Sequence, residues 1–228
     1  MRDKKTILVA MREGVQRDAV TVTLTRFHYN IHTARTAREA MAISDHHHML
    51  LTDANLPGMD GLALIRHLRK SYEAPIIVLL DSEDESAIVN ILDAGANDVL
   101  ILPFGRPEHM ARIRATLRYS ANISCSKTGK IFSVRGLTIN YDSRLVQVNG
   151  LPVHLTPNEF RIMTFLTRNA GKVLTHDQII NEVWGPYNSD NLVLRVNMAN
   201  IRRKIEVNPA EPRYILTEAG IGYRVPSE

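Results

Sequence analysis

The sequence contains a single cysteine, Cys125, among its 228 residues. One thiol excludes an internal disulfide framework and any metal site built from several cysteines, which fits a reducing compartment. No apolar run reaches the roughly 18 to 20 residues that a membrane-spanning helix needs. The first residues also lack the apolar core of a signal peptide. We therefore expect a cytoplasmic protein without a membrane partner.

Common motifs of enzyme chemistry are missing as well. The sequence has no glycine-rich phosphate-binding loop, no H-E-x-x-H zinc motif and no Ser-His-Asp arrangement. We therefore do not expect an enzyme.

The net charge of +4 is unevenly distributed along the chain. Residues 1–121 contain 15 basic and 15 acidic residues, whereas residues 122–228 contain 13 basic and 9 acidic residues. A basic half joined to a neutral half is typical of a nucleic-acid-binding domain attached to a domain with another task. An accidental imbalance is the alternative interpretation.

Residues 1–119 alternate short apolar runs with amphipathic stretches. Leu62, Ile65 and Leu68 recur at helical spacing within residues 61–70. This alternation predicts βα units and a parallel sheet covered by helices, with functional groups at the carboxyl ends of the strands. The predicted strands, buried on both faces, are Ile7–Ala10, Met49–Thr52, Ile76–Leu80 and Val99–Leu102.

Residues 120–130 are small, polar and aperiodic, which predicts a linker that contains Cys125. In residues 131–228 the pattern changes to short strands with turn pairs at Asp142-Ser143 and Asn149-Gly150, typical of an antiparallel meander. The predicted strands are Leu137–Tyr141, Arg144–Val148 and Leu151–Leu155, and a terminal hairpin pairs Tyr214–Thr217 with Gly222–Val225.

Three helices are predicted between the meander and the hairpin. Thr156 and Thr175 each begin a capping box, which marks two helix starts. A longer helix covers Asn191–Val207, and together with the helix before it forms a helix-turn-helix. Its apolar side chains fall on one face, while polar and basic ones cover the others. Asn side chains can read adenine edges, and Arg and Lys can bind guanine or phosphate.

Three motifs of this half resemble the winged helix-turn-helix of OmpR/PhoB-type response regulators. They are W-G-P from Trp184, L-R-V-N-M-A-N-I-R-R-K-I-E from Leu194, and T-E-A-G-I-G-Y-R-V from Thr217. Within that family the sequence is most similar to the KdpE-type regulators of potassium transport. The resemblance implies double-stranded DNA with promoter repeats as the partner, and these DNA-contacting residues: Arg195, Asn197, Asn200, Arg202, Arg203, Lys204, Thr217 and Arg224.

The first half resembles the receiver domain of the same family, which implies a flavodoxin-like (βα)5 fold. T-D-A-N-L-P-G-M-D-G from Thr52 is similar to the phosphoacceptor strand and loop, which places the acceptor carboxylate at Asp53. The rest of the family's site differs. Met11 and Arg12 occupy the positions of the acidic pair that binds Mg²⁺, and Leu80, Leu102 and Val99 replace the hydroxyl residue, the lysine and the aromatic switch.

These replacements predict a degenerate receiver that binds no Mg²⁺ and has no other cofactor. A hard divalent cation needs several oxygen ligands, and phosphoryl transfer depends on the charge that such a cation neutralises. We hypothesise that Arg12 pairs with Asp53 and takes over the electrostatic role of the metal. The alternative is that Asp53 simply faces water.

The resemblance further implies a homodimer through the receiver. Asp98 and Arg112 match one salt bridge of the family's dimer face, and Leu92, Glu108 and Ala111 match other interface positions. We expect a dimer that forms without phosphorylation.

Two other functions stay open. One is a conventional two-component regulator whose sensor kinase phosphorylates Asp53. The other is a regulator that senses a ligand or partner in an apolar pocket at Met11, Leu80 and Leu102. RNA polymerase is a further candidate partner.

Overall fold

The computed structural model describes residues 4–121, 131–186 and 191–228, so most of the predicted linker, with Cys125, lies outside the described residues. The chain divides into two compact units, Met1–Ser120 and Ala121–Glu228. Within the described ranges, no helix has the length and apolar character required to cross a membrane.

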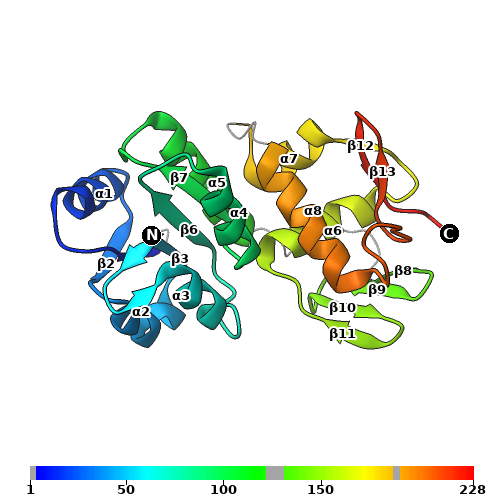
Figure 1. Cartoon of the computed structure of the whole chain (residues 1–228), viewed down its shortest axis with the longest axis horizontal. Helices are drawn as coiled ribbons and strands as arrows, with labels where there is room; N and C mark the ends of the chain where they lie inside the picture. Colours follow the sequence, from blue (N-terminus) through cyan, green and yellow to red (C-terminus); the bar gives the residue numbers. More distant parts are fainter. Residues whose placement is uncertain (1–3, 122–130, 187–190) are drawn as a thin grey trace. The chain divides into compact units, whose positions relative to one another are not determined.

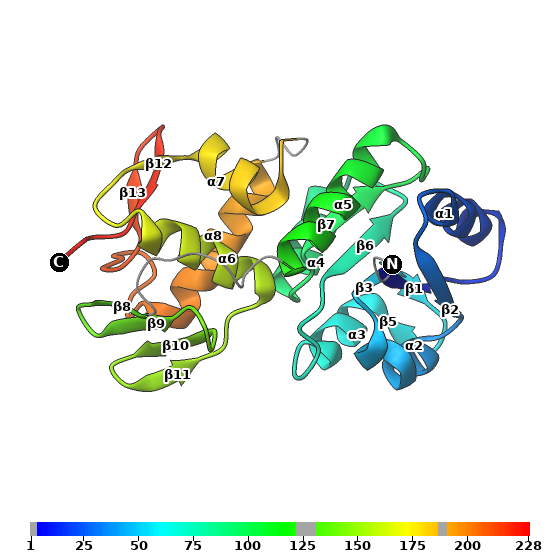
Figure 2. The same ribbon diagram turned by 180° about the vertical axis from the view of Figure 1, so that it is seen from behind.

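The first unit is a five-stranded parallel sheet with helices on both faces (Figures 1 and 2). The strand order is β2-β1-β3-β6-β7, which is the flavodoxin-like order. In chain order its main elements are β1 (Thr6–Ala10), α1 (Val15–Arg26), β2 (Asn30–Ala34), α2 (Ala37–Ile43), β3 (Met49–Asp53), α3 (Gly61–Leu68), β6 (Ile76–Leu80), α4 (Glu85–Asp93), β7 (Asp98–Ile101) and α5 (Pro107–Ala121), with a short turn η1 (Ser44–His46) and a small hairpin of β4 (Asn55–Leu56) and β5 (Met59–Asp60).

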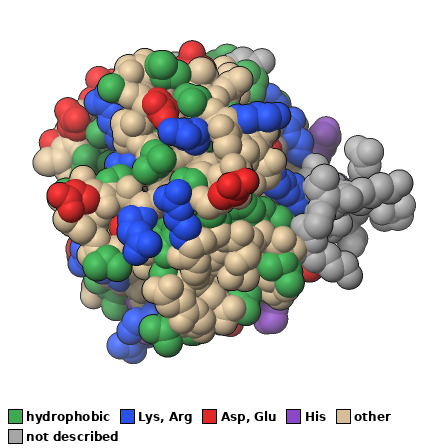
Figure 3. Space-filling model, turned by 90° about the vertical axis from the view of Figure 1, so that its right-hand side faces the viewer, with side chains coloured by type: hydrophobic (Ala, Val, Ile, Leu, Met, Phe, Trp, Pro, Cys, Tyr) green, Lys and Arg blue, Asp and Glu red, His purple; other side chains and the backbone are tan. Residues whose placement is uncertain are grey.

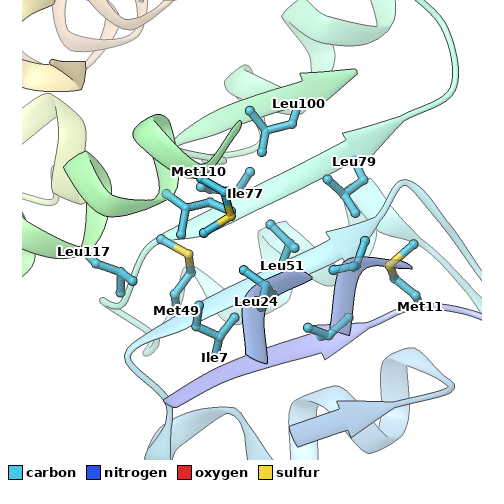
Figure 4. Packing of buried hydrophobic residues seen from close by; sticks show 13 residues of the cluster. Ile7, Met11, Leu24, Met49, Leu51, Ile77, Leu79, Leu100, Met110 and Leu117 are labelled. Atoms are coloured by element: carbon cyan, nitrogen blue, oxygen red, sulfur yellow. The ribbon is translucent and has the colours of Figure 1, made fainter. Parts of the chain in front are cut away.

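The core of this unit lies between the sheet and the helices α1 and α5. Side chains alternate across a strand, so Ile7 and Val9 of β1 face this core while Leu8 is buried on the opposite face. Figure 4 shows this cluster, with Met11 at one end and Leu117 at the other. Burial on both faces explains the continuous apolar runs that predicted the strands β1, β3, β6 and β7.

The strand β2 was not predicted from the sequence. It is an edge strand with the sequence N-I-H-T-A, and Ala34 is its only buried residue. An edge position does not require a continuous apolar run, and a run of that kind was the signal that predicted the other strands.

The second unit begins with an antiparallel meander of β8 (Ile131–Val134), β9 (Leu137–Asn140), β10 (Leu145–Val148) and β11 (Leu151–Val153). Asn149 and Gly150 connect the last two strands with φ values of 51° and 81°. Two positive φ angles define the tight hairpin turn that this residue pair predicts.

The remainder of the second unit consists of three helices and a terminal hairpin. Both predicted capping boxes are present, at Thr156 and at Thr175. The elements are α6 (Pro157–Arg168), β12 (Leu174–Thr175), α7 (His176–Trp184), α8 (Asn191–Ile205), β13 (Leu216–Glu218) and β14 (Gly222–Arg224). β14 pairs with both β12 and β13, and we call the β13–β14 hairpin the wing.

Candidate functional site

Asp53 is the last residue of β3, at the carboxyl edge of the parallel sheet. Loops that follow neighbouring parallel strands meet at this edge, which is where such sheets place their functional groups. The Asp53 side chain is 7% exposed, and its Oδ1 accepts a hydrogen bond of 3.0 Å from the backbone N–H of Asn55. Its second carboxylate oxygen has no hydrogen bond or ion pair within the described chain.

Met11 and Arg12, which follow β1, lie beside Asp53. Met11 is 1% exposed and belongs to the hydrophobic core (Figure 4), whereas Arg12 is exposed. Both residues line a cavity of about 270 Å³ together with Asp53 and with Gly14 and Gln16 at the start of α1.

The predicted ion pair between Arg12 and Asp53 is wrong. In the described part of the chain, Arg12 makes no hydrogen bond and no ion pair. The apolar Met11 takes the buried position after β1, which leaves the next side chain turned toward solvent. Asp53 and Arg12 therefore border one cavity without a hydrogen bond or ion pair between them.

The predicted apolar pocket at Met11, Leu80 and Leu102 is not a single cavity. Leu80 lines a different cavity of about 350 Å³ whose walls include residues of α3 and α4. Leu102 packs against the core cluster, and Val99 on β7 is buried. Each apolar replacement is thus absorbed by packing next to its own strand.

The donor set beside Asp53 is a poor match for a hard divalent cation. No group of three or more His, Cys, Asp or Glu side chains in the described ranges is placed to hold a metal ion. The thioether of Met11 offers no oxygen, and the Arg12 guanidinium repels a cation. Glu13 lines the same cavity, but its carboxylate pairs with Arg35 at 2.8 Å.

The residues predicted for a dimer face lie on α4, β7 and α5. Arg112 connects two carboxylates of its own chain, with Nη1 3.3 Å from Asp98 Oδ1 and Nη2 2.6 Å from Glu108 Oε1. Leu92 and Ala111 are buried within the unit, so they offer little apolar surface to a partner. Glu108, whose side chain is 46% exposed, is the accessible member of this set.

In the second unit, α8 exposes one line of residues. Asn191, Arg195 and Ala199 follow each other at intervals of four and are all exposed, and Arg203 is exposed near the helix end. Residues four apart lie on the same face of a helix. Arg195 has no hydrogen bond or ion pair among the described residues, so its charge is available to a partner.

The two asparagines of α8 differ in their availability. Asn197 is 4% exposed, and its amide donates a hydrogen bond of 2.8 Å to the carbonyl of Val193 in the preceding turn. Its expected contact with DNA stays a prediction, and this contact would have to compete with the hydrogen bond inside the helix. Asn200 is also buried, but its amide has no partner within the described chain.

Arg202 connects α8 to the wing. Its Nη2 donates hydrogen bonds of 2.6 Å to the carbonyl of Ile215 and to Thr217 Oγ1, and its guanidinium lies 5.7 Å from the ring centre of Tyr223. Burial raises the pKa of Tyr223, and the nearby charges of Arg202 and Arg195 partly offset this effect. Arg202 and Thr217 are thus hydrogen-bonded to each other in the DNA-free protein, whereas the sequence predicts that both contact DNA.

Two further basic residues predicted to contact DNA are paired. Lys204 Nζ lies 2.6 Å from Glu159 Oε2 of α6, and Arg224 Nη2 lies 2.9 Å from Glu218 Oε1 across the wing. Each pairing neutralises a charge that the sequence alone assigns to DNA.

Glu206 is a key residue of this region that the sequence analysis missed. Its buried carboxylate accepts backbone hydrogen bonds of 2.8 to 3.0 Å from Arg213, Tyr214 and Ile215. This fixes the segment that leads into the wing. An acidic residue at a helix C-terminus is unfavourable for the helix dipole, and this anomaly was the available signal.

Comparison with known proteins identifies both units. Residues 7–114 match the family described as response regulator receiver domain, and residues 150–225 match the family described as transcriptional regulatory protein, C terminal. KdpE of Escherichia coli (strain K12), described as the KDP operon transcriptional regulatory protein, is 43% identical over 178 residues, which are 77% of this chain and 78% of that protein. The chain belongs to the OmpR/PhoB-type response regulators.

Other relatives agree with this assignment. This OmpR/PhoB-type regulator is 36% identical to KdpE of Mycobacterium tuberculosis (strain H37Rv) over 209 residues, 90% of the chain and 92% of that protein. The Thermotoga maritima OmpR/PhoB homologue DrrB matches with a TM-score of 0.52 and 25% identity, over 98% of this chain and 99% of that one. A RitR variant matches with a TM-score of 0.78 and 24% identity over 98% and 100% of the two chains, which shows the shared fold alone.

The comparisons confirm the predicted fold class and the KdpE-like resemblance. The regulator consists of a receiver followed by a winged helix-turn-helix that binds DNA.

Proposed function

We propose that this KdpE-like regulator binds promoter repeats in double-stranded DNA as a homodimer, in the cytoplasm, without phosphorylation of Asp53 and without Mg²⁺. A sensor kinase is then not required for its active form. RNA polymerase is the partner that such a DNA-bound dimer would contact.

The observation that carries this proposal is the set of side chains around Asp53. Phosphoryl transfer to a carboxylate depends on a metal ion that neutralises the phosphoryl oxygens. Here a buried thioether and an exposed guanidinium follow β1, and Glu13 is held by Arg35. Leu80 and Leu102 offer no hydrogen bond to a phosphoryl group. The chain therefore lacks the main electrostatic contributions to that reaction.

For DNA binding we propose that Arg195, Arg203 and Asn200 of α8 make the direct contacts. Arg195 is exposed and unpaired in the described chain, and the Asn200 amide keeps its hydrogen-bonding capacity. Figure 3 faces the part of the molecule that carries the wing, where Lys and Arg side chains are interspersed with acidic, apolar and uncharged ones. This mixed surface favours a few specific contacts over a continuous basic patch.

For the dimer we propose the face formed by α4, β7 and α5. The charged group Asp98–Arg112–Glu108 carries two carboxylates and one guanidinium, and Glu108 is accessible to a basic group of a second copy. Isologous pairing would place the same group twice across a twofold axis.

Intact-mass spectrometry after incubation with acetyl phosphate and Mg²⁺ tests the proposal. We expect no phosphoryl adduct on the native chain and unchanged binding to promoter DNA. Asp53→Asn is the negative control. The double variant Met11→Glu/Arg12→Asp, which restores an acidic pair, serves as the matched control and should gain reactivity. A stoichiometric adduct on the native chain that is lost in Asp53→Asn would refute phosphorylation independence.

A conventional phosphorylated regulator is the second candidate, and one observation favours it. Asp53 keeps its place at the end of β3, with one carboxylate oxygen that has no partner in the described chain. The mass measurement distinguishes the two candidates directly.

A further inference from the structure

The cavity beside Asp53 has opposite charges on its walls. We propose that it binds a small zwitterion, a molecule with one carboxylate and one ammonium group. The proposal goes beyond the function proposed above and does not depend on it, because it concerns binding to the receiver alone.

The anionic end of the ligand would lie at the start of α1. The N-cap residue of this 12-residue helix is Gly14, which has no side chain to accept a hydrogen bond from the first turn. The N–H groups of such a turn lack intrahelical partners and carry the positive end of the helix dipole. Arg12, which lines the same cavity, adds a full positive charge that no described residue pairs.

The cationic end would lie at Asp53. This carboxylate is more than nine-tenths buried, and only one of its oxygens accepts a hydrogen bond in the described chain. The other oxygen has no partner in the described chain, and an ammonium group in the cavity would give it a charge-assisted hydrogen bond. The Glu13 carboxylate does not compete with Asp53 for the ammonium group, because Arg17 and Arg35 lie 3.7 and 2.8 Å from it.

Size and charge narrow the choice of ligand. A cavity of about 270 Å³ holds a molecule no larger than a common amino acid. A simple anion would be repelled by Asp53, and a metal ion or simple cation by Arg12. A molecule with both charges can pair with Arg12 and with Asp53. The apolar Met11 side chain, on the side of the hydrophobic core, offers the ligand no further polar contact.

NMR titration of the full chain, followed through the backbone amides of Val15, Gln16 and Asn55, tests the proposal. The probes are glycine, β-alanine and 4-aminobutyrate, which differ in the separation of their charges. Acetate and methylammonium are the single-charge controls. We expect at least one zwitterion to shift these amides, with an affinity about tenfold or more above both controls, as the loss of one charge-assisted hydrogen bond predicts.

Two variants and a matched control complete the test. Arg12→Gln and Asp53→Asn should each weaken binding about tenfold, whereas Arg38→Gln, which removes an exposed charge that lines another cavity, should leave it unchanged. Absence of binding by all three zwitterions would overturn the proposal. Acetate that binds as tightly as the zwitterions, and still binds to Asp53→Asn, would define an anion site and also overturn the proposal. Methylammonium or Mg²⁺ that binds as tightly as the zwitterions would overturn it as well. None of these outcomes affects phosphorylation or DNA binding, which are measured separately.

Discussion

The wing region of the DNA-binding unit and the Asp53 edge of the receiver differ in how their charged side chains are paired. In the DNA-binding unit, Arg202, Lys204, Arg224 and Glu206 are all held by hydrogen bonds or ion pairs inside the unit. At the functional edge of the receiver, Arg12 and one oxygen of Asp53 have no partner in the described chain. Paired charges fix the geometry of a recognition surface, whereas unpaired charges beside a cavity are available to a ligand.

The strongest test of this contrast removes a paired charge. Glu206→Gln replaces a carboxylate that accepts three backbone N–H groups with an amide that offers one acceptor oxygen and a competing donor. We expect the free energy of unfolding of this unit to fall by about 2 to 4 kcal/mol. Denaturant unfolding followed by the fluorescence of Trp184, the chain's only tryptophan, measures it. The exposed Glu211→Gln is the control, and an equal loss in both variants would contradict the role of Glu206.

Arg202 tests whether a paired arginine positions the wing. Arg202→Met removes the hydrogen bonds to Ile215 and Thr217, so we expect a loss of about 1 to 2 kcal/mol in stability together with weaker DNA binding. Arg195→Met is the matched variant on the same helix. It should leave stability unchanged while lowering DNA affinity about tenfold and reducing the salt slope by about one. A stability loss in Arg195→Met but not in Arg202→Met would contradict the role of Arg202 in positioning the wing.

These pairings also explain what the sequence predicted and what it missed. Apolar periodicity, capping boxes and the Asn149-Gly150 turn are local signals, and they predicted the central strands and the helices of the second unit. The bond from Arg202 to Thr217 joins residues 15 positions apart, and the pair Lys204–Glu159 joins residues 45 apart. Such partners depend on tertiary packing, so the sequence pattern of α8 could not predict them. The burial of Met11, which turns Arg12 away from Asp53, likewise results from tertiary packing that local sequence signals do not show.

A paired group inside the receiver gives a smaller, pH-dependent effect. His47 Nδ1 donates to the carbonyl of Ile43, so its Nε2 accepts from His32 Nδ1 at 2.8 Å. Burial lowers the pKa of His47 below its ordinary value of 6.5. The unfolded chain therefore binds more protons, and stability falls as the pH drops below about 6.5, by at most about 1.4 kcal/mol per pH unit for one proton. Receiver melting between pH 5 and pH 8 checks this, and His47→Asn should flatten the profile.

The smallest expected effect is at the unpaired carboxylate. Asp53→Asn keeps an oxygen that accepts from the Asn55 N–H and removes a buried, half-paired charge, so we expect receiver stability to stay the same or rise by up to about 1 kcal/mol. In the DNA-binding unit, by contrast, neutralising the Glu206 carboxylate should lower the free energy of unfolding. Parallel thermal melts of Asp53→Asn and Glu206→Gln measure the difference. A clear loss of stability in Asp53→Asn would contradict this expectation, because it would mean that the second carboxylate oxygen makes a favourable interaction in the folded receiver.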